Sequence, residues 1–223
     1  MIDIWPQVIE LSEYTIDKFS HNNILSIPEK YQYNKEGIVW KNYMWMSNTF
    51  RRAHIEILDA RESKKMWIMH MTIYPHTNCP DPIFGFDIVC GKNKITGAFH
   101  DFSAVGDSEL YFWYYNKMAD LDWSKPRELP EWAQRIFSAH MVAAGNIQTQ
   151  EELDKLKNIF IDNLNYYLYN VGKIKDNNNY SWKHNYYSIN QKKNPHTPAM
   201  MKTFGIDEQL FKQFMDEVLF PEI

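Results

Sequence analysis

Five short runs rich in aromatic and β-branched residues follow one another in the first half of the chain, with only turns between them. They span residues 37–46, 50–59, 66–74, 83–90 and 95–101. The breaks are polar or rich in proline, and residues 91–94 form a typical tight turn. Parallel strands need a crossover of a dozen or more residues, which these turns cannot provide. The five runs therefore predict an antiparallel meander.

The pattern changes from strand to helix after this region. Thr149-Gln150-Glu151-Glu152 matches a capping box, and apolar residues follow it at helical spacing as far as Gly172. Other helices are expected in the N-terminal 30 residues and at about 109–120, from 129, in a stretch broken by Pro195 and Pro198, and at about 207–219. We therefore predict an α/β fold: one domain, residues 1–223, forming a three-layer α/β/α sandwich around a central antiparallel sheet.

Composition and charge exclude several classes of protein. A net charge of −4 gives no electrostatic case for binding nucleic acid. The two cysteines, Cys79 and Cys90, form no CxxC pair, which argues against a disulfide framework or an iron–sulfur cluster. No apolar run has the length of a membrane span, and the N-terminus carries acids where a signal peptide needs basic residues. We expect a soluble intracellular protein.

Ionisable residues occur inside the predicted strands, where an ordinary half-buried sheet has little use for them. His54 and Glu56 share one face of the second run, and His70 and Asp87 lie in the third and fourth. Each alone is most simply an ordinary sheet residue, but four on neighbouring strands predict a pocket that mixes acids and bases. Burial would separate their pKa values, as proton-coupled chemistry requires.

Two chemical interpretations of this pocket remain open at this stage. Two histidines and a carboxylate can hold iron or zinc, although no HxD or HExxH spacing supports a metal site. The other interpretation is proton transfer to a bound planar molecule. The sequence contains no GxGxxG motif and no P-loop, so the electrons for such a reaction would come from an external carrier.

A series of motifs, in order and at similar spacing, resembles the ferredoxin-dependent bilin reductases, most closely the phycocyanobilin:ferredoxin oxidoreductase branch. The similarity extends from about residue 40 to residue 221. The motifs are Phe50-Arg51-Arg52-Ala53-His54-Ile55-Glu56, Met69-His70, Tyr74-Pro75, Pro82-Ile83-Phe84-Gly85-Phe86-Asp87-Ile88-Val89, Asp101-Phe102-Ser103, Pro126-Arg127-Glu128-Leu129-Pro130-Glu131-Trp132, His184-Asn185-Tyr186, Phe204-Gly205 and Val218-Leu219-Phe220-Pro221.

The resemblance implies a specific reaction. Members of this family bind biliverdin IXα between the sheet and the C-terminal helices and reduce it through bilin radicals. Reduced ferredoxin supplies the electrons, and no metal or organic cofactor is bound. By position, Asp87 matches the family's central proton donor, and His70 matches the histidine that contacts the bilin lactam. Glu56 matches the carboxylate that serves reduction of the D-ring vinyl group, and His54 is expected to contact the substrate.

Departures from the family pattern affect the expected product. Asn194 stands where several members carry an aspartate, and an amide cannot act as an acid. Water or His196 would have to replace that acid, and both Asn194 and His196 are expected to bind substrate. The segment 141–146 lacks the arginine that relatives place near there to hold a propionate. These departures favour phycoerythrobilin, the product of a phage-type offshoot of the branch, with phycocyanobilin as the alternative.

The resemblance also implies partners and a location. We expect a monomer in the cytoplasm of a cyanobacterial or phage-infected cell, or in a plastid stroma. Because ferredoxin is acidic, a basic docking surface is expected, or else a plain solvated face. The candidate lysines are Lys173, Lys175, Lys183, Lys192, Lys193 and Lys202. The alternatives from other classes are a non-haem metal enzyme and a bilin carrier or lyase without redox activity.

Overall fold

A computed structural model describes residues 2–223 and contains the predicted meander. Each strand pairs antiparallel with the next, and the observed bounds lie within a few residues of the expected ones. The five strands are β3 (Ile38–Met46), β4 (Phe50–Ala60), β5 (Met66–Pro75), β6 (Ile83–Cys90) and β7 (Ile95–Ser103). Three short strands that the sequence pattern did not reveal complete an eight-stranded sheet: β1 (Asn23–Ile24), β2 (Tyr33–Lys35) and β8 (Val142–Ala144).

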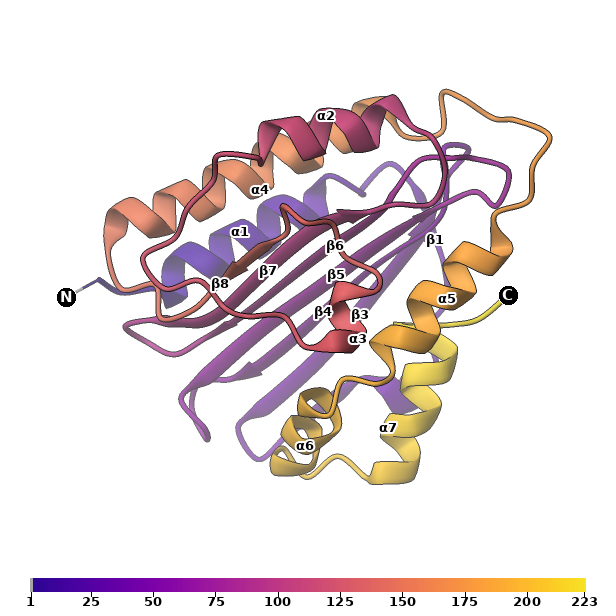
Figure 1. Cartoon of the computed structure of the whole chain (residues 1–223). Helices are drawn as coiled ribbons and strands as arrows, with labels where there is room; N and C mark the ends of the chain where they lie inside the picture. Colours follow the sequence, from indigo (N-terminus) through magenta and orange to yellow (C-terminus); the bar gives the residue numbers. More distant parts are fainter. Residues whose placement is uncertain (1) are drawn as a thin grey trace.

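Three helices cover one face of the sheet (Figure 1). They are α1 (Trp5–Asp17), α2 (Glu109–Lys117) and α4 (Gln150–Asn170). Their apolar sides pack on alternate residues of the strands, among them Ile55, Met71 and Phe86, and form the larger hydrophobic core. Only one of the two hydrogen bonds of the predicted capping box forms. The Thr149 hydroxyl accepts the backbone N–H of Glu152, but the Glu152 carboxylate accepts two hydrogen bonds from Ser124.

The remaining helices lie on the opposite face, so the predicted three-layer α/β/α sandwich is confirmed (Figure 1). They are α3 (Glu131–Gln134), α5 (Ser181–Gln191), α6 (His196–Thr203) and α7 (Glu208–Phe214), which continues as a π-helical turn, η2 (Met215–Leu219). A 3₁₀ turn, η1 (Glu29–Tyr31), precedes β2. The break expected at Pro195 separates α5 from α6, but the break expected at Pro198 is wrong, because Pro198 lies in the first turn of α6, where a helix tolerates proline. No helix within residues 2–223 is both long and apolar enough to cross a membrane.

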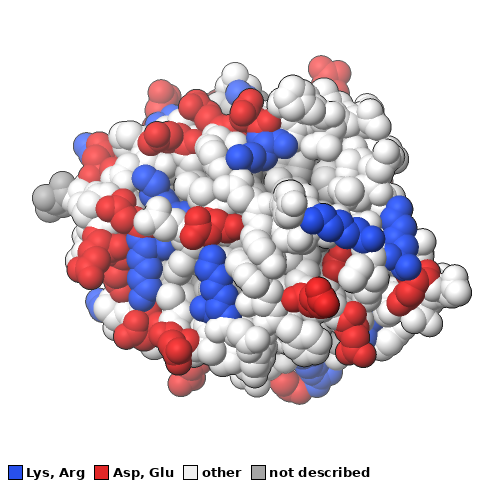
Figure 2. Space-filling model, turned by 90° about the horizontal axis from the view of Figure 1, so that it is seen from above, with Lys and Arg blue, Asp and Glu red and all other residues white. Residues whose placement is uncertain are grey.

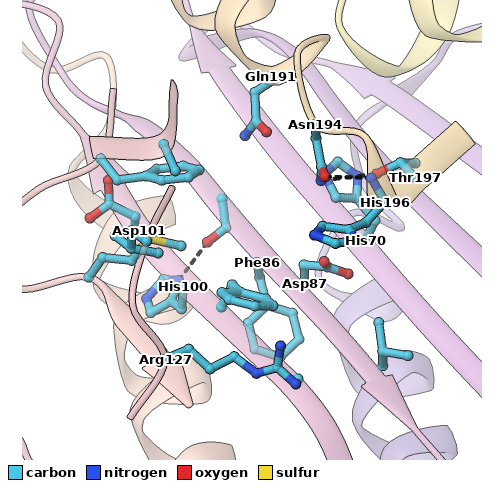
Figure 3. A pocket seen from close by; sticks show the side chains of 18 of the residues that line it. His70, Phe86, Asp87, His100, Asp101, Arg127, Gln191, Asn194, His196 and Thr197 are labelled. Atoms are coloured by element: carbon cyan, nitrogen blue, oxygen red, sulfur yellow. Dashed lines mark hydrogen bonds between the residues drawn. The ribbon is translucent and has the colours of Figure 1, made fainter. Parts of the chain in front are cut away.

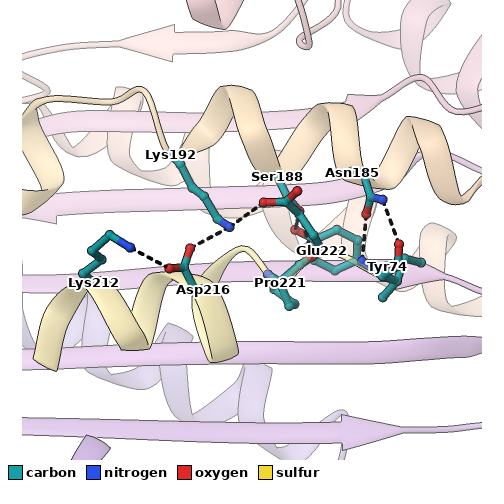
Figure 4. Close-up of polar contacts among 9 residues, drawn as sticks. Tyr74, Asn185, Ser188, Lys192, Lys212, Asp216, Pro221 and Glu222 are labelled. Atoms are coloured by element: carbon teal, nitrogen blue, oxygen red, sulfur yellow. Dashed lines mark hydrogen bonds and ion pairs between the residues drawn. The ribbon is translucent and has the colours of Figure 1, made fainter. Parts of the chain in front are cut away.

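Polar contacts attach the C-terminal tail to α5 (Figure 4). The Lys192 ammonium lies 2.7 Å from an Asp216 carboxylate oxygen and 2.8 Å from one of Glu222. The Asn185 side chain exchanges two backbone hydrogen bonds with Ile223, each 2.8 Å long. These contacts hold the preceding Phe220 over the sheet, where its ring forms part of a cavity wall.

Candidate active site

A cavity of about 570 Å³ lies between the sheet and the second helical layer. Its floor is the face of β4 to β7 that the larger core leaves free, because strand side chains alternate between the two faces. Its other walls come from the segment before α3, from α5 and α6, and from the C-terminal tail. The residues central to the site are Glu56, His70, Asp87, Phe99, Asp101, Arg127, Phe137, Tyr187, Gln191, Asn194, His196 and Phe220.

The register of the sheet brings three of the predicted site residues into one row. Glu56 of β4 lies directly opposite His70 of β5, and His70 lies directly opposite Asp87 of β6. Side chains in directly opposite positions are close neighbours on the same face. His70 and Asp87 are seen side by side on the cavity floor (Figure 3). Of the four residues that the sequence suggested for a pocket, the register brings Glu56, His70 and Asp87 together.

The Glu56 carboxyl is nearly buried, with 6% of the residue exposed. Burial raises its pKa to about 7, and the nearby charge of Asp87 acts in the same direction. The indole N–H of Trp40 donates a 2.6 Å hydrogen bond to Oε1 of Glu56, which favours the ionised form and lowers the pKa in part. Glu56 is thus a carboxyl whose pKa is raised towards neutral pH, with one oxygen occupied by a hydrogen bond.

Burial shifts the pKa values of Asp87 and His70 in opposite directions. The pKa of Asp87 is raised to about 7, because a charged carboxylate is poorly solvated on the cavity floor. The pKa of His70 is lowered to about 4 for the same reason, so this imidazole is neutral at physiological pH. Its Nδ1 atom is buried without a hydrogen-bond partner, and Phe220 packs against the ring at 5.5 Å in an edge-on arrangement. The site therefore combines protonatable carboxyls with a neutral imidazole.

His54 is buried on the same face as Glu56 but is not among the residues that line the cavity. Its Nε2 lies 3.0 Å from Oδ1 of Asn42, and Asn42 donates its amide N–H to the carbonyl of Tyr31. The Asn42 oxygen must therefore be the acceptor, so Nε2 of His54 carries the proton. The Phe214 ring packs over His54 at 6.1 Å. His54 therefore lies outside the cavity wall, and its contacts support strand β4 beside Glu56.

Asn194 and His196 do line the cavity, at the connection between α5 and α6 (Figure 3). The Asn194 side chain is occupied at both ends by its own loop. Its amide donates to the Thr197 hydroxyl at 3.1 Å, and its carbonyl accepts the backbone N–H of His196 at 3.0 Å. Asn194 therefore shapes the start of α6, while the His196 ring is free to face a ligand.

Arg127 is a site residue that the sequence did not single out. Of the cavity-lining residues, all within the described part of the chain, Arg127 alone carries a permanent positive charge. Its backbone N–H bonds to the carbonyl of Ala143, and its guanidinium donates to the carbonyl of Thr96. A Cβ on Gly145 would lie 2.7 Å from Nε of Arg127, so the absence of a side chain there leaves room for the arginine.

Arg127 lies beside the segment 141–146, which contains no arginine of its own. That segment contains β8, and Pro126 pairs with Ala144 of β8 in an isolated bridge. The pairing brings the Arg127 side chain alongside 141–146 and over the Phe99 ring, at 5.9 Å from the ring centre. A cation therefore reaches the cavity from a neighbouring stretch of backbone, a long-range contact that sequence spacing does not reveal.

Metal binding has a separate geometric test. Among residues 2–223, no three side chains of His, Cys, Asp and Glu are grouped closely enough to hold a metal ion. The row of Glu56, His70 and Asp87 places two carboxyls and one imidazole on the same face of the sheet.

Fold and site together define a class of protein: an α/β/α sandwich whose sheet presents buried acids and a neutral histidine to a large, partly aromatic cavity. The family model described as "Ferredoxin-dependent bilin reductase" matches residues 2–221. The chain therefore belongs to the ferredoxin-dependent bilin reductases, a family of oxidoreductases.

Individual relatives agree with this assignment. The phycocyanobilin:ferredoxin oxidoreductase of Prochlorococcus marinus is 28% identical over 193 residues, covering 80% of this chain and 74% of the relative. The enzyme of the same name from Trichodesmium erythraeum is 30% identical over 107 residues, 46% of this chain and 42% of that protein.

Solved structures give the same result at the level of the fold. The structure of PcyX has a TM-score of 0.71 and 28% sequence identity, with 97% of this chain and 99% of that chain covered. Phytochromobilin synthase from tomato, solved in complex with biliverdin, has a TM-score of 0.69 and 16% identity, with 97% and 82% covered.

Proposed function

We propose that this protein reduces biliverdin IXα to a phycobilin, in single-electron steps supplied by reduced ferredoxin and through bilin radicals. The observation that carries this proposal is the row of Glu56, His70 and Asp87 on the floor of a cavity large enough for a flat ligand. A reaction that adds electrons one at a time needs proton donors at fixed places, and two carboxyls with pKa values near 7 meet that need. The protein itself contributes positioning and protons.

Each member of the row has a distinct role in this proposal. Asp87, in the centre of the floor, donates protons to the bilin as electrons arrive. Neutral His70 offers a ring nitrogen for hydrogen bonding to a bilin carbonyl and lies directly opposite both carboxyls. Glu56 supplies a second acid at the edge of the row, restrained by its hydrogen bond from Trp40.

Arg127 is our candidate for holding a propionate of the substrate. A guanidinium presents a planar set of donors that matches a carboxylate, and such charge-assisted hydrogen bonds are strong. Arg127 lies near the opening of the cavity with Phe99 beneath it. A bilin bound with its carboxylates towards Arg127 would have its pyrrole rings over Asp87 and His70.

The proposed product is phycoerythrobilin, formed by a four-electron reduction, with phycocyanobilin as the alternative. Two features support this choice. The Asn194 amide is occupied by its own loop and offers no acid. The Trp40 hydrogen bond stabilises the ionised form of Glu56, the residue whose counterpart serves D-ring vinyl reduction in the family, and so reduces the protonated fraction of Glu56 that can donate a proton.

The proposed docking surface for ferredoxin is defined by Tyr169, Lys173, Ile174, Lys175, Trp182 and Lys183, where α4 ends and α5 begins. Tyr169 and Trp182 are largely exposed, and Lys173 and Lys183 stack on their rings at 3.7 and 4.7 Å. Lys192 is removed from the expected set, because it is paired with Asp216 and Glu222. Seen from above, basic and acidic side chains alternate (Figure 2). Docking would therefore depend on local contacts more than on net charge.

The test is anaerobic turnover of the purified protein with biliverdin IXα, ferredoxin and a ferredoxin-reducing system. The visible spectrum follows the reaction, and chromatography identifies the products. Loss of biliverdin with formation of phycoerythrobilin is the expected result. Phycocyanobilin would refute the product, and a stable biliverdin complex without reduction would refute the function and favour a carrier.

A further inference from the structure

Asp101 is a buried acid in the cavity that the proposed roles leave unused. It is 1% exposed, and it lies on β7 among the residues that line the main cavity. Its carboxyl accepts hydrogen bonds from the Ser103 hydroxyl at 2.8 Å, from the Ser138 hydroxyl at 2.5 Å and from the Ser138 backbone N–H at 3.1 Å. Burial raises its pKa to about 6 in spite of these hydrogen bonds.

A second cavity, of about 150 Å³, adjoins the main one. It is lined by Ser103 and Ser138, the two hydroxyl partners of Asp101, and it shares Phe137 and Tyr187 with the main cavity. Asp101 itself lines only the main cavity. The carboxyl and its two serines therefore form part of the wall between the cavities, with hydrogen-bonding groups on both sides.

Tyr187 occupies the space between Asp101 and Asp87. A Cβ built on Gly85 would lie 3.3 Å from the Tyr187 hydroxyl, so the hydroxyl lies directly above this glycine. Gly85 is opposite Asp101 on β7 and two residues before Asp87 on β6, so both carboxyls are its neighbours on the same face. The charges of both carboxyls contribute to raising the pKa of Tyr187, after the larger effect of burial.

The hydroxyl of Tyr187 is also oriented to give a proton away. Gln191 donates its amide N–H to the tyrosine oxygen at 2.7 Å, so this oxygen is an acceptor in that bond. Within residues 2–223, no side chain or carbonyl accepts the hydroxyl proton of Tyr187. The proton is therefore available to a ligand, to water or to a neighbouring carboxylate.

We propose that Ser138, Asp101 and Tyr187 form a proton path from the second cavity to Asp87. This inference rests on the proposed function, because it supplies the protons that Asp87 delivers. A ligand that fills the main cavity covers Asp87 and separates it from bulk water, so the acid needs another source of protons.

The path is balanced at each step and moves no electrons. Asp87 gives its proton to the reduced bilin and becomes a carboxylate. Tyr187 passes its hydroxyl proton to that carboxylate, directly or through one water, as its oxygen takes a proton from the Asp101 carboxyl in the same step, so no free tyrosinate forms. Asp101 is then reprotonated from solvent in the second cavity through the Ser138 hydroxyl.

Other charged groups surround the path. Tyr111 of α2 faces Asp101 from the helix on the β7 side, and Arg135 and Lys183 line the second cavity. Arg135 is paired with Glu131 at the surface. Burial raises the pKa of Asp101, and the hydrogen bonds from Ser138 and Ser103 oppose this effect.

The experiment measures a single turnover of the biliverdin complex with reduced ferredoxin between pH 6 and pH 8, in H₂O and D₂O. The variants are Tyr187→Phe, Asp101→Asn and the double variant, with Ser138→Ala as a smaller change in case Asp101→Asn does not fold. The matched control is Tyr167→Phe, which removes a buried hydroxyl from the opposite side of the sheet, where it donates to the Pro82 carbonyl.

We expect each path variant to slow the proton-limited phase about tenfold or more at pH 8, with a larger solvent isotope effect than in the wild type. The double variant should be no slower than the slower single variant, because both block one route. Rates within twofold of the wild type, or losses that multiply in the double variant, would overturn the path and show that protons enter through the main cavity. Failure of the wild type itself to reduce biliverdin would instead refute the proposed function, and the path with it.

Discussion

The Asp87 carboxylate should destabilise the folded protein at neutral pH, and this loss of stability can be measured. Its pKa rises from an ordinary 3.8 to about 7 on folding, because burial penalises the carboxylate. At 1.36 kcal/mol for each tenfold change in proton affinity, this corresponds to at most about 4 kcal/mol. Between pH 4 and pH 7 the unfolded chain releases a proton that the folded chain keeps, so the contribution of Asp87 is lost as pH rises through this range.

The perturbation is Asp87→Asn, which keeps the shape of the side chain and removes the titration. The assay is urea unfolding from pH 4 to pH 8, comparing the free energy of unfolding of the variant with that of the wild type. Relative to the wild type, the variant should gain stability steadily as pH rises from 4 to 7, by up to about 4 kcal/mol, and then level off. The same variant should lose turnover about 100-fold or more, because it removes the proposed general acid.

The matched control is Asp59→Asn, on strand β4 of the same sheet, with β5 between it and the β6 strand of Asp87. Asp59 is paired with Arg61 at 2.7 Å, and the hydrogen bonds and charge of Arg61 lower its pKa against a partial burial effect. Its replacement should therefore have the opposite pH dependence, with a small relative loss of stability that is complete by about pH 5, because above that pH Asp59 is ionised in both the folded and the unfolded chain. If the stability difference between Asp87→Asn and the wild type does not change from pH 4 to pH 8, the reasoning about burial at this position is refuted.

Three further predictions concern substrate, protonation and partner. Arg127→Ala should weaken biliverdin binding about tenfold to 100-fold, as expected for loss of a charge-assisted hydrogen bond, with Arg127→Lys intermediate; an unchanged Kd in an absorbance titration would remove Arg127 as the carboxylate-binding residue. Trp40→Phe removes the N–H donor to Glu56, so the pKa of Glu56 should rise and the basic limb of the pH–rate profile should move to higher pH. Chromatography should then show a larger share of phycocyanobilin among the products. An unchanged profile and product would contradict this role of Trp40. Lys173→Glu with Lys175→Glu should raise the KM for ferredoxin several-fold at low salt and less at high salt, whereas Lys35→Glu on the edge strand β2 should not; equal effects of the two changes would place docking elsewhere.

The central strands could be predicted from sequence because their signal is local. In β4, alternation assigns Ile55 to the core and Glu56 to the opposite face, and the structure agrees. Strands β1, β2 and β8 have only two or three residues each, too short to show a period. The same alternation placed Glu56, His70 and Asp87 on neighbouring strands, but their register across residues 61–65 and 76–82 is known only from the structure.

The rest of the site depends on contacts between distant segments. Arg127 reaches the cavity only because residues 126–127 pair with β8, and nothing in its spacing to Thr96 or Phe99 indicates this. Tyr187 and Gln191 are four residues apart on α5, a spacing that allows their hydrogen bond. The packing of α5 on the sheet is what places the Tyr187 hydroxyl above Gly85. Sequence periodicity indicates which face of a helix or strand is apolar, but not which other segment of the chain packs against that face.

The measurement that tests the central claim most directly is an anaerobic single turnover of the biliverdin complex, in the wild type and in Asp87→Asn, followed by visible and electron paramagnetic resonance spectra. The account predicts that the wild type converts biliverdin to phycoerythrobilin. In the variant, electrons should still arrive from ferredoxin but a bilin radical should accumulate, because protons are not delivered. Complete conversion by Asp87→Asn at the wild-type rate, or a wild-type complex that accepts no electrons, would contradict the account.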